Sequence, residues 1–230
     1  MKYKFRRLVI VALGGSVVCP DAIDSRFIRE FKKFVEKNIK RGKRFLLVVG
    51  GGRICREYQD AASRVAPLAD EDKDWLGIHV SRLNAHLIRT VFRKIANPIV
   101  IDARHKVKKL TRPVTVAGGW RPGWSTDYVA TALAYDFGAR EVIVAGKPDY
   151  VYDRDPHKGK GAKSFRTLTW TRYQRLIPGK WTPGFHSPVD PVAARLAQKK
   201  KLKAIVVDGR NLKNFENLLS GKSFRGTVIG

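Results

Sequence analysis

The most informative segment of this chain is Gly118-Gly119-Trp120-Arg121-Pro122-Gly123-Trp124-Ser125-Thr126-Asp127. An apolar, strand-like run at 113–117 precedes it, and an apolar, helix-like run at 128–137 follows it. Glycines let a backbone approach a ligand closely, and residues 125–127 are typical of a helix N-cap region. The start of a helix offers free N–H groups and a positive dipole end, which suit a phosphate. The stretch therefore predicts an anion cradle between a strand and a helix.

The same order of strand, glycines and helix occurs at two further places. Leu13-Gly14-Gly15-Ser16 follows an apolar run at 8–12, and Gly50-Gly51-Gly52 follows another at 45–49. Because each turn can hold an anion, three of them predict two phosphorylated ligands, and hence phosphoryl transfer between the two.

Length and composition indicate a globular protein. The 230 residues, 43% of them hydrophobic, suffice for one large domain or two small lobes with a real core. No apolar run approaches the roughly 18 residues of a membrane span, and the basic N-terminus leads into an expected core strand rather than a signal peptide. Cys19 and Cys55 lack the spacing of a metal site, so we expect no protein-held metal and a reduced, cytoplasmic setting.

The net charge of +26 predicts attraction to anions, either nucleotides or nucleic acid. The basic residues are spread along the whole chain, and the densest cluster, at 199–203, lies at the end of a predicted helix, where it suits the dipole. No nucleic-acid-binding motif is visible. A generally basic surface is therefore favoured over a nucleic-acid partner.

Strands and helices alternate along the chain, which predicts an α/β fold with a mainly parallel central sheet. The expected strands are 6–13, 44–49, 98–102, 114–117, 141–145, 204–208 and 226–229. The expected helices are 25–40, 53–64, 72–95, 128–137, 191–200 and 212–219, with Gly42, Gly138 and Gly221 where C-caps would lie. Trp75 and Leu83 are assigned to the buried side of the 72–95 helix. The stretch 147–188 is irregular, as functional loops often are.

Five blocks, in this order, resemble the uridylate (UMP) kinases of the amino-acid kinase superfamily, and the resemblance covers nearly the whole chain. The blocks are residues 13–16, 48–53 with Arg56, 74–78 with 82–85, 119–127, and 149–152 with 155–156; a late block at 188–191 also fits. The first block has no lysine and looks more like the archaeal-type enzymes than the common bacterial ones.

The resemblance implies a single domain, 1–230, folded as a three-layer α/β/α sandwich. It implies a mainly UMP-binding lobe at 1–145 and a mainly ATP-binding lobe at 146–230. The expected reaction moves the γ-phosphate of ATP to UMP, giving UDP and ADP, with Mg²⁺ held mainly by the nucleotide phosphates. Relatives are typically hexamers, so we expect a homohexamer, with UMP and ATP as ligands.

The resemblance also assigns site residues by position. For ATP these are Gly14, Gly15, Ser16, Gly52, Arg56, Gly146, Lys147, Tyr152 and Asp155. For UMP they are Gly51, Asp74, Gly119, Trp120, Arg121, Pro122, Gly123, Trp124, Ser125 and Thr126. For catalysis they are Asp190, Arg56 and Gly15.

Several of these residues have a simpler structural reading as well. Asp74 matches the residue that holds the ribose hydroxyls, but it also lies among acidic residues at a helix start. Asp190 matches the acid that organises the catalytic centre, but Asp190-Pro191 is also a good helix start. Arg56 is either a phosphate ligand or surface charge. Trp124 either stacks on a base or packs between subunits.

The sequence departs from the family pattern at two places. Many relatives carry a lysine where this chain has Ala12, and phosphoryl transfer needs positive charge there. Arg53, Arg56, Lys147 and Lys180 are the candidate substitutes. Tyr150 replaces the usual glycine after Asp149, which changes the loop. Two alternatives therefore stay open: another small-substrate kinase of the superfamily, acting for example on carbamate, acetylglutamate or isopentenyl phosphate, or a catalytically lapsed relative that binds RNA or another anion.

Overall fold

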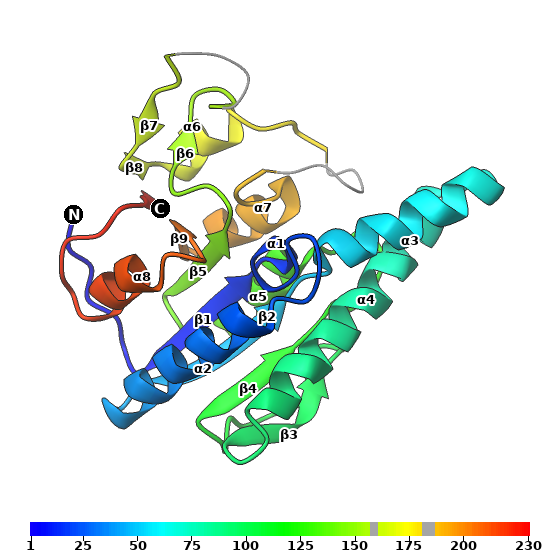
Figure 1. Cartoon of the computed structure of the whole chain (residues 1–230). Helices are drawn as coiled ribbons and strands as arrows, with labels where there is room; N and C mark the ends of the chain where they lie inside the picture. The colour runs from blue at the N-terminus through cyan, green and yellow to red at the C-terminus, as the bar shows by residue number, and fades with distance from the viewer. Residues whose placement is uncertain (157–160, 181–186) are drawn as a thin grey trace.

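An eight-stranded sheet forms the centre of the protein in the computed structural model, which describes residues 1–156, 161–180 and 187–230 (Figure 1). Its strands lie in the order β3 (Ala96–Ile101), β4 (Val114–Ala117), β2 (Arg44–Val49), β1 (Leu8–Leu13), β5 (Glu141–Gly146), β9 (Lys203–Asp208), β10 (Thr227–Ile229) and β8 (Thr167–Leu168). Within the described residues, β9 and β10 are the antiparallel pair of this sheet, and its other pairs are parallel.

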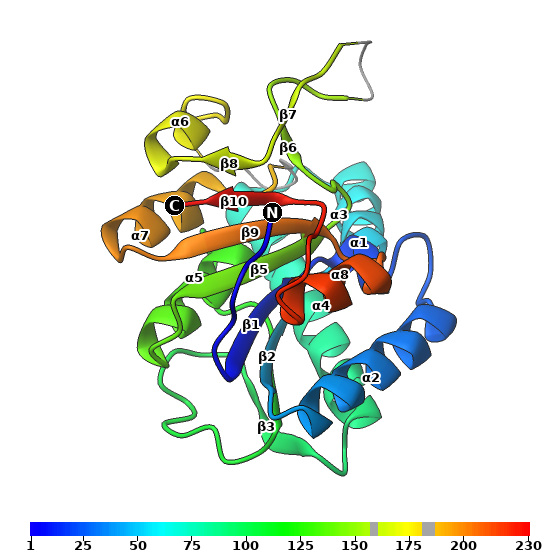
Figure 2. The same cartoon turned by 90° about the vertical axis from the view of Figure 1, so that its left-hand side faces the viewer.

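Helices cover both faces of the sheet, as Figure 2 shows from the side. The helices are α1 (Gly15–Val18), α2 (Ser25–Lys40), α3 (Gly52–Val65), α4 (Asp70–Val91), α5 (Thr126–Asp136), α6 (Trp170–Gln174), α7 (Pro191–Lys199) and α8 (Leu212–Leu219). Residues of α2, α4 and α8 share one buried apolar cluster, and residues of α5, α6 and α7 share the other.

Alternate residues of each strand feed these two clusters. In β1, Val9 and Val11 face the cluster with α2, whereas Ile10 and Ala12 face the cluster with α5. A strand covered on both faces reads as a continuous apolar run, which is why the run at 8–13 predicted a buried parallel strand. The expected three-layer α/β/α sandwich is confirmed. Because β5 pairs with both β1 and β9, a single sheet continues across residue 145, the expected boundary between the UMP-binding and ATP-binding lobes.

Element boundaries differ from the expected ones by a few residues. Helix α4 begins at Asp70 and ends at Val91, and β3 begins at Ala96 rather than 98. Pro98 biases Asn97 toward extended backbone, and a proline is tolerated there because β3 is the edge strand of the sheet. Gly42, Gly138 and Gly221 follow helix ends with φ of 85°, 67° and 71°, so the predicted C-cap glycines are confirmed.

The stretch expected to be irregular contains short elements in its described part. Strand β6 (Val151–Tyr152) pairs with β7 (Ser164–Phe165) as a separate antiparallel ribbon, and β8 and α6 follow. Two-residue strands carry no periodicity, and α6 has only five residues, so neither could be recognised from its sequence pattern.

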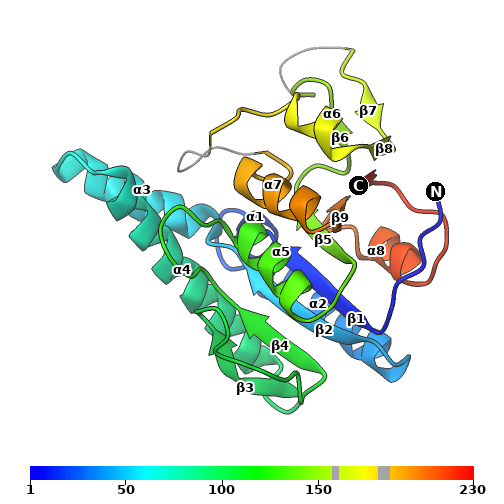
Figure 3. The same ribbon diagram turned by 180° about the vertical axis from the view of Figure 1, so that it is seen from behind.

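Helices α3 and α4 form an arm that extends beyond the sheet, visible in Figures 1 and 3. Helix α3 has no residue that is fully buried. On α4, Ile78 and Ile88 are buried as expected, but Trp75 is 38% and Leu83 is 68% exposed. Their assignment to the buried side was wrong. Trp75 lies on the first turns of α4, which pack beside α3, where Gln59 donates to the Lys73 carbonyl. Leu83 lies where α4 packs on the sheet through Ser81, Asn84 and Ala85, but on the exposed side of the helix.

Candidate active site

The glycine turns gather at one edge of the sheet. Strands β1, β2 and β5 are parallel neighbours, so their carboxyl ends meet there, where open α/β sheets bind their ligands. The backbone itself joins the turns: Gly14 N–H donates to the Ala145 carbonyl at 2.9 Å, and Gly50 N–H donates to the Leu13 carbonyl at 3.0 Å.

The glycine turns at 14–16 and 50–52 are in direct backbone contact. A Cβ on Gly15 would lie 1.9 Å from the Gly52 nitrogen, and a Cβ on Gly50 would lie 2.7 Å from the Gly15 nitrogen. Gly52 has a φ of 72°, in the region that favours glycine. Only glycine fits at Gly15 and Gly52, so the two turns form a single cradle.

Three adjoining pockets lie along this edge. The first, of about 260 Å³, lies between α3, the start of α4 and the 119–127 loop. The central pocket, of about 430 Å³, lies over the glycine cradle, and the outer pocket, of about 670 Å³, lies beside β6 and α6. Arg56, Thr126 and Asp127 line both the first and the central pocket, whereas Lys147 and Pro148 line both the central and the outer one.

The structure distributes the predicted residues among these pockets. The first pocket is lined by Gly51, Gly52, Arg56, Asp74, Gly119, Arg121, Trp124, Ser125, Thr126 and Asp190. The central pocket is lined by Gly14, Gly15, Ser16, Gly51, Gly52, Arg56, Thr126, Gly146 and Lys147. The outer pocket is lined by Lys147, Tyr152 and Asp155. Most residues expected for UMP thus line the first pocket, and those expected for ATP line the other two, with Gly51, Gly52, Arg56 and Thr126 shared between the first and the central pocket.

The loop after β4 is held by its backbone. Arg82 donates from Nε to the Gly119 carbonyl at 3.0 Å and from Nη2 to the Trp120 carbonyl at 2.9 Å. Ser81 Oγ accepts from Gly119 N–H at 2.6 Å. A loop fixed by such buried or half-buried bonds presents its side chains in defined positions.

Trp120 was expected among the UMP-binding residues, but its side chain lines none of the three pockets. It is 5% exposed, packs in the cluster with α5, and donates from Nε1 to the Ile101 carbonyl at 3.3 Å. Burying a large apolar ring with its N–H paired outweighs leaving it in a polar pocket. Pro122 and Gly123 do not line the three pockets either, but Gly123 acts on the site through its N–H.

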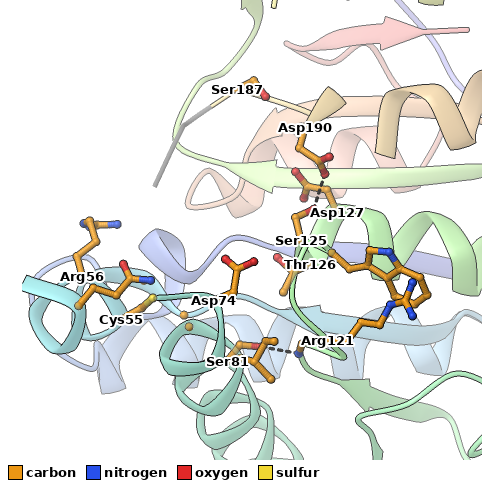
Figure 4. Close-up of a pocket in the computed structure, with 17 residues that line it drawn as sticks. Cys55, Arg56, Asp74, Ser81, Arg121, Ser125, Thr126, Asp127, Ser187 and Asp190 are labelled. Carbon is orange, nitrogen blue, oxygen red and sulfur yellow. Dashed lines mark hydrogen bonds between the residues drawn. The ribbon is translucent and has the colours of Figure 1, made fainter. Parts of the chain in front are cut away.

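Asp74 points into the middle of the first pocket (Figure 4). Its Oδ2 accepts from Gly123 N–H at 2.8 Å, which ties the start of α4 to the 119–127 loop. Burial raises the pKa of this carboxyl, with Asp70 and Glu71 adding to the effect, while the Gly123 bond opposes it. The other carboxylate oxygen remains to accept a hydroxyl.

Two further carboxylates lie above Asp74 in Figure 4, Asp127 and Asp190. Asp190 caps α7 by accepting from Val192 N–H at 2.7 Å and Ala193 N–H at 2.9 Å, and its other oxygen accepts from Ser125 Oγ. It is 5% exposed, and burial raises the pKa of this carboxyl against the effect of these bonds. Asp190 is therefore both the predicted helix cap and a residue of the pocket wall.

Asp127 was not among the predicted site residues, although it lines two pockets. Surrounding protein raises its pKa to about 8, and the nearby charge of Asp190 adds to the shift, even though part of the residue remains accessible. Its sequence signal was ambiguous, because an acid in the first turn of a helix is common. Cys55, Ser81 and Ser187 also line the first pocket and were missed, since none belongs to a recognisable local motif.

The cation candidates separate clearly in space. Ala12 lines the central pocket, as do Arg56 and Lys147. Arg53 instead forms ion pairs with Glu57 and Asp21 outside these pockets, and Lys180 is exposed and lines none of them. Among the described residues, the central pocket therefore has two basic side chains.

The outer pocket carries the residues after β5. Tyr152 donates from its hydroxyl to Asp149 Oδ1 at 2.7 Å, and burial together with Asp149 raises the pKa of this phenol to about 12. Tyr150 meets Tyr152 edge-on, with ring centroids 6.3 Å apart. The tyrosine that replaces the usual glycine is thus packed on the wall of this pocket.

Comparisons with known proteins agree with this arrangement. The model of the amino acid kinase family matches residues 7–208. The uridylate kinase of Thermococcus sibiricus is 31% identical over 224 residues, which are 96% of this chain and 98% of the relative, and that of Thermococcus onnurineus is 32% identical over the same shares.

Solved structures agree as well. The crystal structure of uridylate kinase from Archaeoglobus fulgidus has a TM-score of 0.83 at 30% identity, covering 98% of this chain and 100% of that one. UMP kinase from Bacillus anthracis has a TM-score of 0.78 at 19% identity, covering 97% and 96%, and shares the fold. The match to the family model, the full-length relatives and the glycine cradle lead to one conclusion: this chain is a member of the amino acid kinase family.

Proposed function

We propose that the protein is an ATP:UMP phosphotransferase, which makes UDP and ADP in pyrimidine nucleotide synthesis. The observation that carries this proposal is the line of three adjoining pockets with the Gly15–Gly52 cradle at its centre. A donor nucleotide and an acceptor nucleotide that enter from opposite ends would bring their phosphates together over that cradle. The uridylate kinases among the full-length relatives support UMP as the acceptor.

UMP is assigned to the first pocket. Asp74 is suited to accept from the ribose hydroxyls, because a carboxylate accepts two donors and only one of its oxygens is bonded to Gly123. Gly51 would contact the UMP phosphate, and Arg56, which also lines the central pocket, would lie between this phosphate and those of ATP. Gly119, Arg121, Trp124, Ser125 and Thr126 would surround the nucleoside.

ATP is assigned to the central and outer pockets. Gly14, Gly15, Ser16, Gly52 and Arg56 would contact its phosphates, with Gly146 and Lys147 between phosphate and base. Tyr152 and Asp155 would contact adenosine in the outer pocket.

The chemistry of the transfer is mainly positioning and electrostatic stabilisation. Arg56 and Lys147 supply positive charge in the central pocket, where Ala12 stands in place of a lysine. Asp190 holds Ser125 and the start of α7 in place across the pocket. The donor set also fits Mg²⁺ bound mainly through nucleotide phosphates, because the crowded Asp127 and Asp190 carboxylates favour a nearby cation. Bound there, Mg²⁺ would neutralise phosphate charge.

A homohexamer built from dimers is the proposed assembly. Besides the family resemblance, the support is the α3–α4 arm, on which Tyr58 and Val65 are 57% and 88% exposed, together with Trp75 and Leu83. Exposed apolar side chains gathered on one arm are typical of an interface.

Among the helices of the described residues, none has the length and apolar character of a membrane span. Both cysteines are free thiols, which supports the cytoplasm as the compartment.

The test is an ADP-release assay on the folded protein with ATP and Mg²⁺. UMP should support turnover, with CMP and AMP much poorer and carbamate, acetylglutamate and isopentenyl phosphate inactive. Turnover with one of the latter three would identify a different kinase of the family. No turnover with any acceptor, in a sample whose fold is verified by circular dichroism, would favour a lapsed anion-binding relative.

A further inference from the structure

Arg121 occupies an unusual position in the first pocket. Its guanidinium carbon lies 3.8 Å from the centroid of the Trp124 ring, and Trp124 in turn lies 4.5 Å from the Tyr128 ring on α5. A guanidinium stacked over an indole is attracted to its face and keeps the N–H groups at its edge free for other partners. Within the described residues, no hydrogen bond or ion pair engages this guanidinium, although Arg121 lines the pocket.

The backbone beneath Arg121 is fixed. The carbonyls of Gly119 and Trp120 accept from Arg82, and the Arg121 carbonyl accepts from Trp124 N–H at 3.3 Å. The loop therefore offers donors to a ligand from Arg121, while its three neighbouring carbonyls already have partners.

The position of Arg121 relative to Asp74 indicates which part of a nucleotide it would meet. In Figure 4, Asp74 lies between Arg56 and Arg121. Arg56 also lines the central pocket over the glycine cradle, whereas Arg121 lines the first pocket and not the central one. With the phosphate near Arg56 and the ribose at Asp74, the base extends toward Arg121.

Uracil and cytosine have nearly the same shape, so a pocket separates them chiefly by hydrogen bonds. At position 4 uracil carries a carbonyl oxygen, which accepts, and cytosine carries an amino group, which donates. A guanidinium has five donors and no acceptor, so it pairs with the uracil oxygen and leaves the cytosine amino group facing another donor. A site built to hydrogen-bond one group discriminates strongly against an analogue that lacks it.

We propose that Arg121, held on Trp124, selects uracil over cytosine by donating to O4 of the acceptor base. This inference rests on the proposed function, since it presumes a pyrimidine nucleotide in the first pocket. Under this proposal Arg121 acts as a hydrogen-bond donor that distinguishes two uncharged bases, rather than only as a positive charge near the ligand.

The test compares kcat/KM for UMP and CMP in the full-length wild type, Arg121→Met and Arg121→Gln. We expect Arg121→Met to lower kcat/KM for UMP roughly tenfold to a hundredfold, as for the loss of one charged hydrogen bond, and to change the value for CMP by less than about threefold. Arg121→Gln offers an amide oxygen that can accept from the cytosine amino group, so it should raise CMP relative to UMP. Arg29→Met, an exposed substitution on α2 away from the pockets, is the matched control and should leave both values unchanged.

Other outcomes would overturn the proposal. Equal losses for UMP and CMP would mean that Arg121 contacts the phosphate or a group common to both bases. Unchanged values for both would mean that the guanidinium does not reach the base. A wild type without any pyrimidine-nucleotide turnover would refute the proposed function itself, and this is seen before any variant is made.

Discussion

Arg56→Ala should slow the phosphoryl transfer step severely. Arg56 lines both the first and the central pocket, so it borders the place where acceptor and donor phosphates would meet. Ala12 supplies no charge there, and the other basic side chain of the described central pocket is Lys147. The transition state therefore depends on few fixed cations.

The magnitude follows from Coulomb's law. Two unit charges about 5 Å apart at an effective dielectric constant of about 20 interact by about 3 kcal/mol. Each 1.36 kcal/mol changes a rate about tenfold, so losing Arg56 should lower kcat by about 10²-fold. A loss of this size is comparable to that of one preorganised donor in an oxyanion hole.

The assay is steady-state ADP release at saturating UMP and ATP. Arg64→Ala is the matched control, because Arg64 is an exposed arginine in the last turn of the same helix. Lys147→Ala and the double variant show whether the two cations act independently, in which case their effects multiply. If Arg56→Ala and Arg64→Ala had equally small effects, the reasoning would be refuted and the compensating charge would lie at Lys147.

Three further predictions follow from the site and the arm. Asp74→Ala should raise the KM for UMP by roughly ten- to hundredfold and leave the KM for ATP nearly unchanged. Steady-state kinetics with each substrate varied in turn would measure both values. An unchanged KM for UMP would mean that Asp74 only holds the 119–127 loop through Gly123. Because the folded-state pKa of Asp127 is raised from 3.8 to about 8, the unfolded chain loses this proton first, so stability declines as pH rises from about 4 to about 8 and is level above. Asp127→Asn should thus raise the melting temperature at pH 8 but not at pH 4, and a gain independent of pH would contradict the assignment. Light scattering at micromolar concentration should find a hexamer for the wild type and smaller, folded species for the Leu83→Glu variant, since Leu83 is 68% exposed in the single chain; a monomeric wild type would contradict the assembly.

Local sequence patterns determined the architecture of this protein. Continuous apolar runs ending in glycines predicted parallel strands and anion-binding turns, because a strand covered on both faces and a turn without side chains each leave a short, contiguous signature. The helix caps at Ser125 and Asp190 were readable for the same reason: capping joins residues two or three positions apart.

Relations between distant segments became visible only in the folded chain. The contact of Gly15 with Gly52 joins residues from different elements, and so does the burial of Asp127 beside the charge of Asp190, which raises the Asp127 pKa. The choice of Arg56 and Lys147 over Arg53 and Lys180 depended on which side chains line the central pocket. No pattern within one segment carries such information.

Burial was the other property that local patterns could not settle. Trp120 and Trp124 stand four residues apart in one loop, yet the first is buried with its N–H bonded to Ile101 and the second lines the pocket beneath Arg121. Leu83 has helical spacing with the buried residues of α4 but lies exposed. The type of a side chain sets how strongly it favours burial, but which side chains are buried depends on the elements that pack against them, and that arrangement exists only in the folded chain.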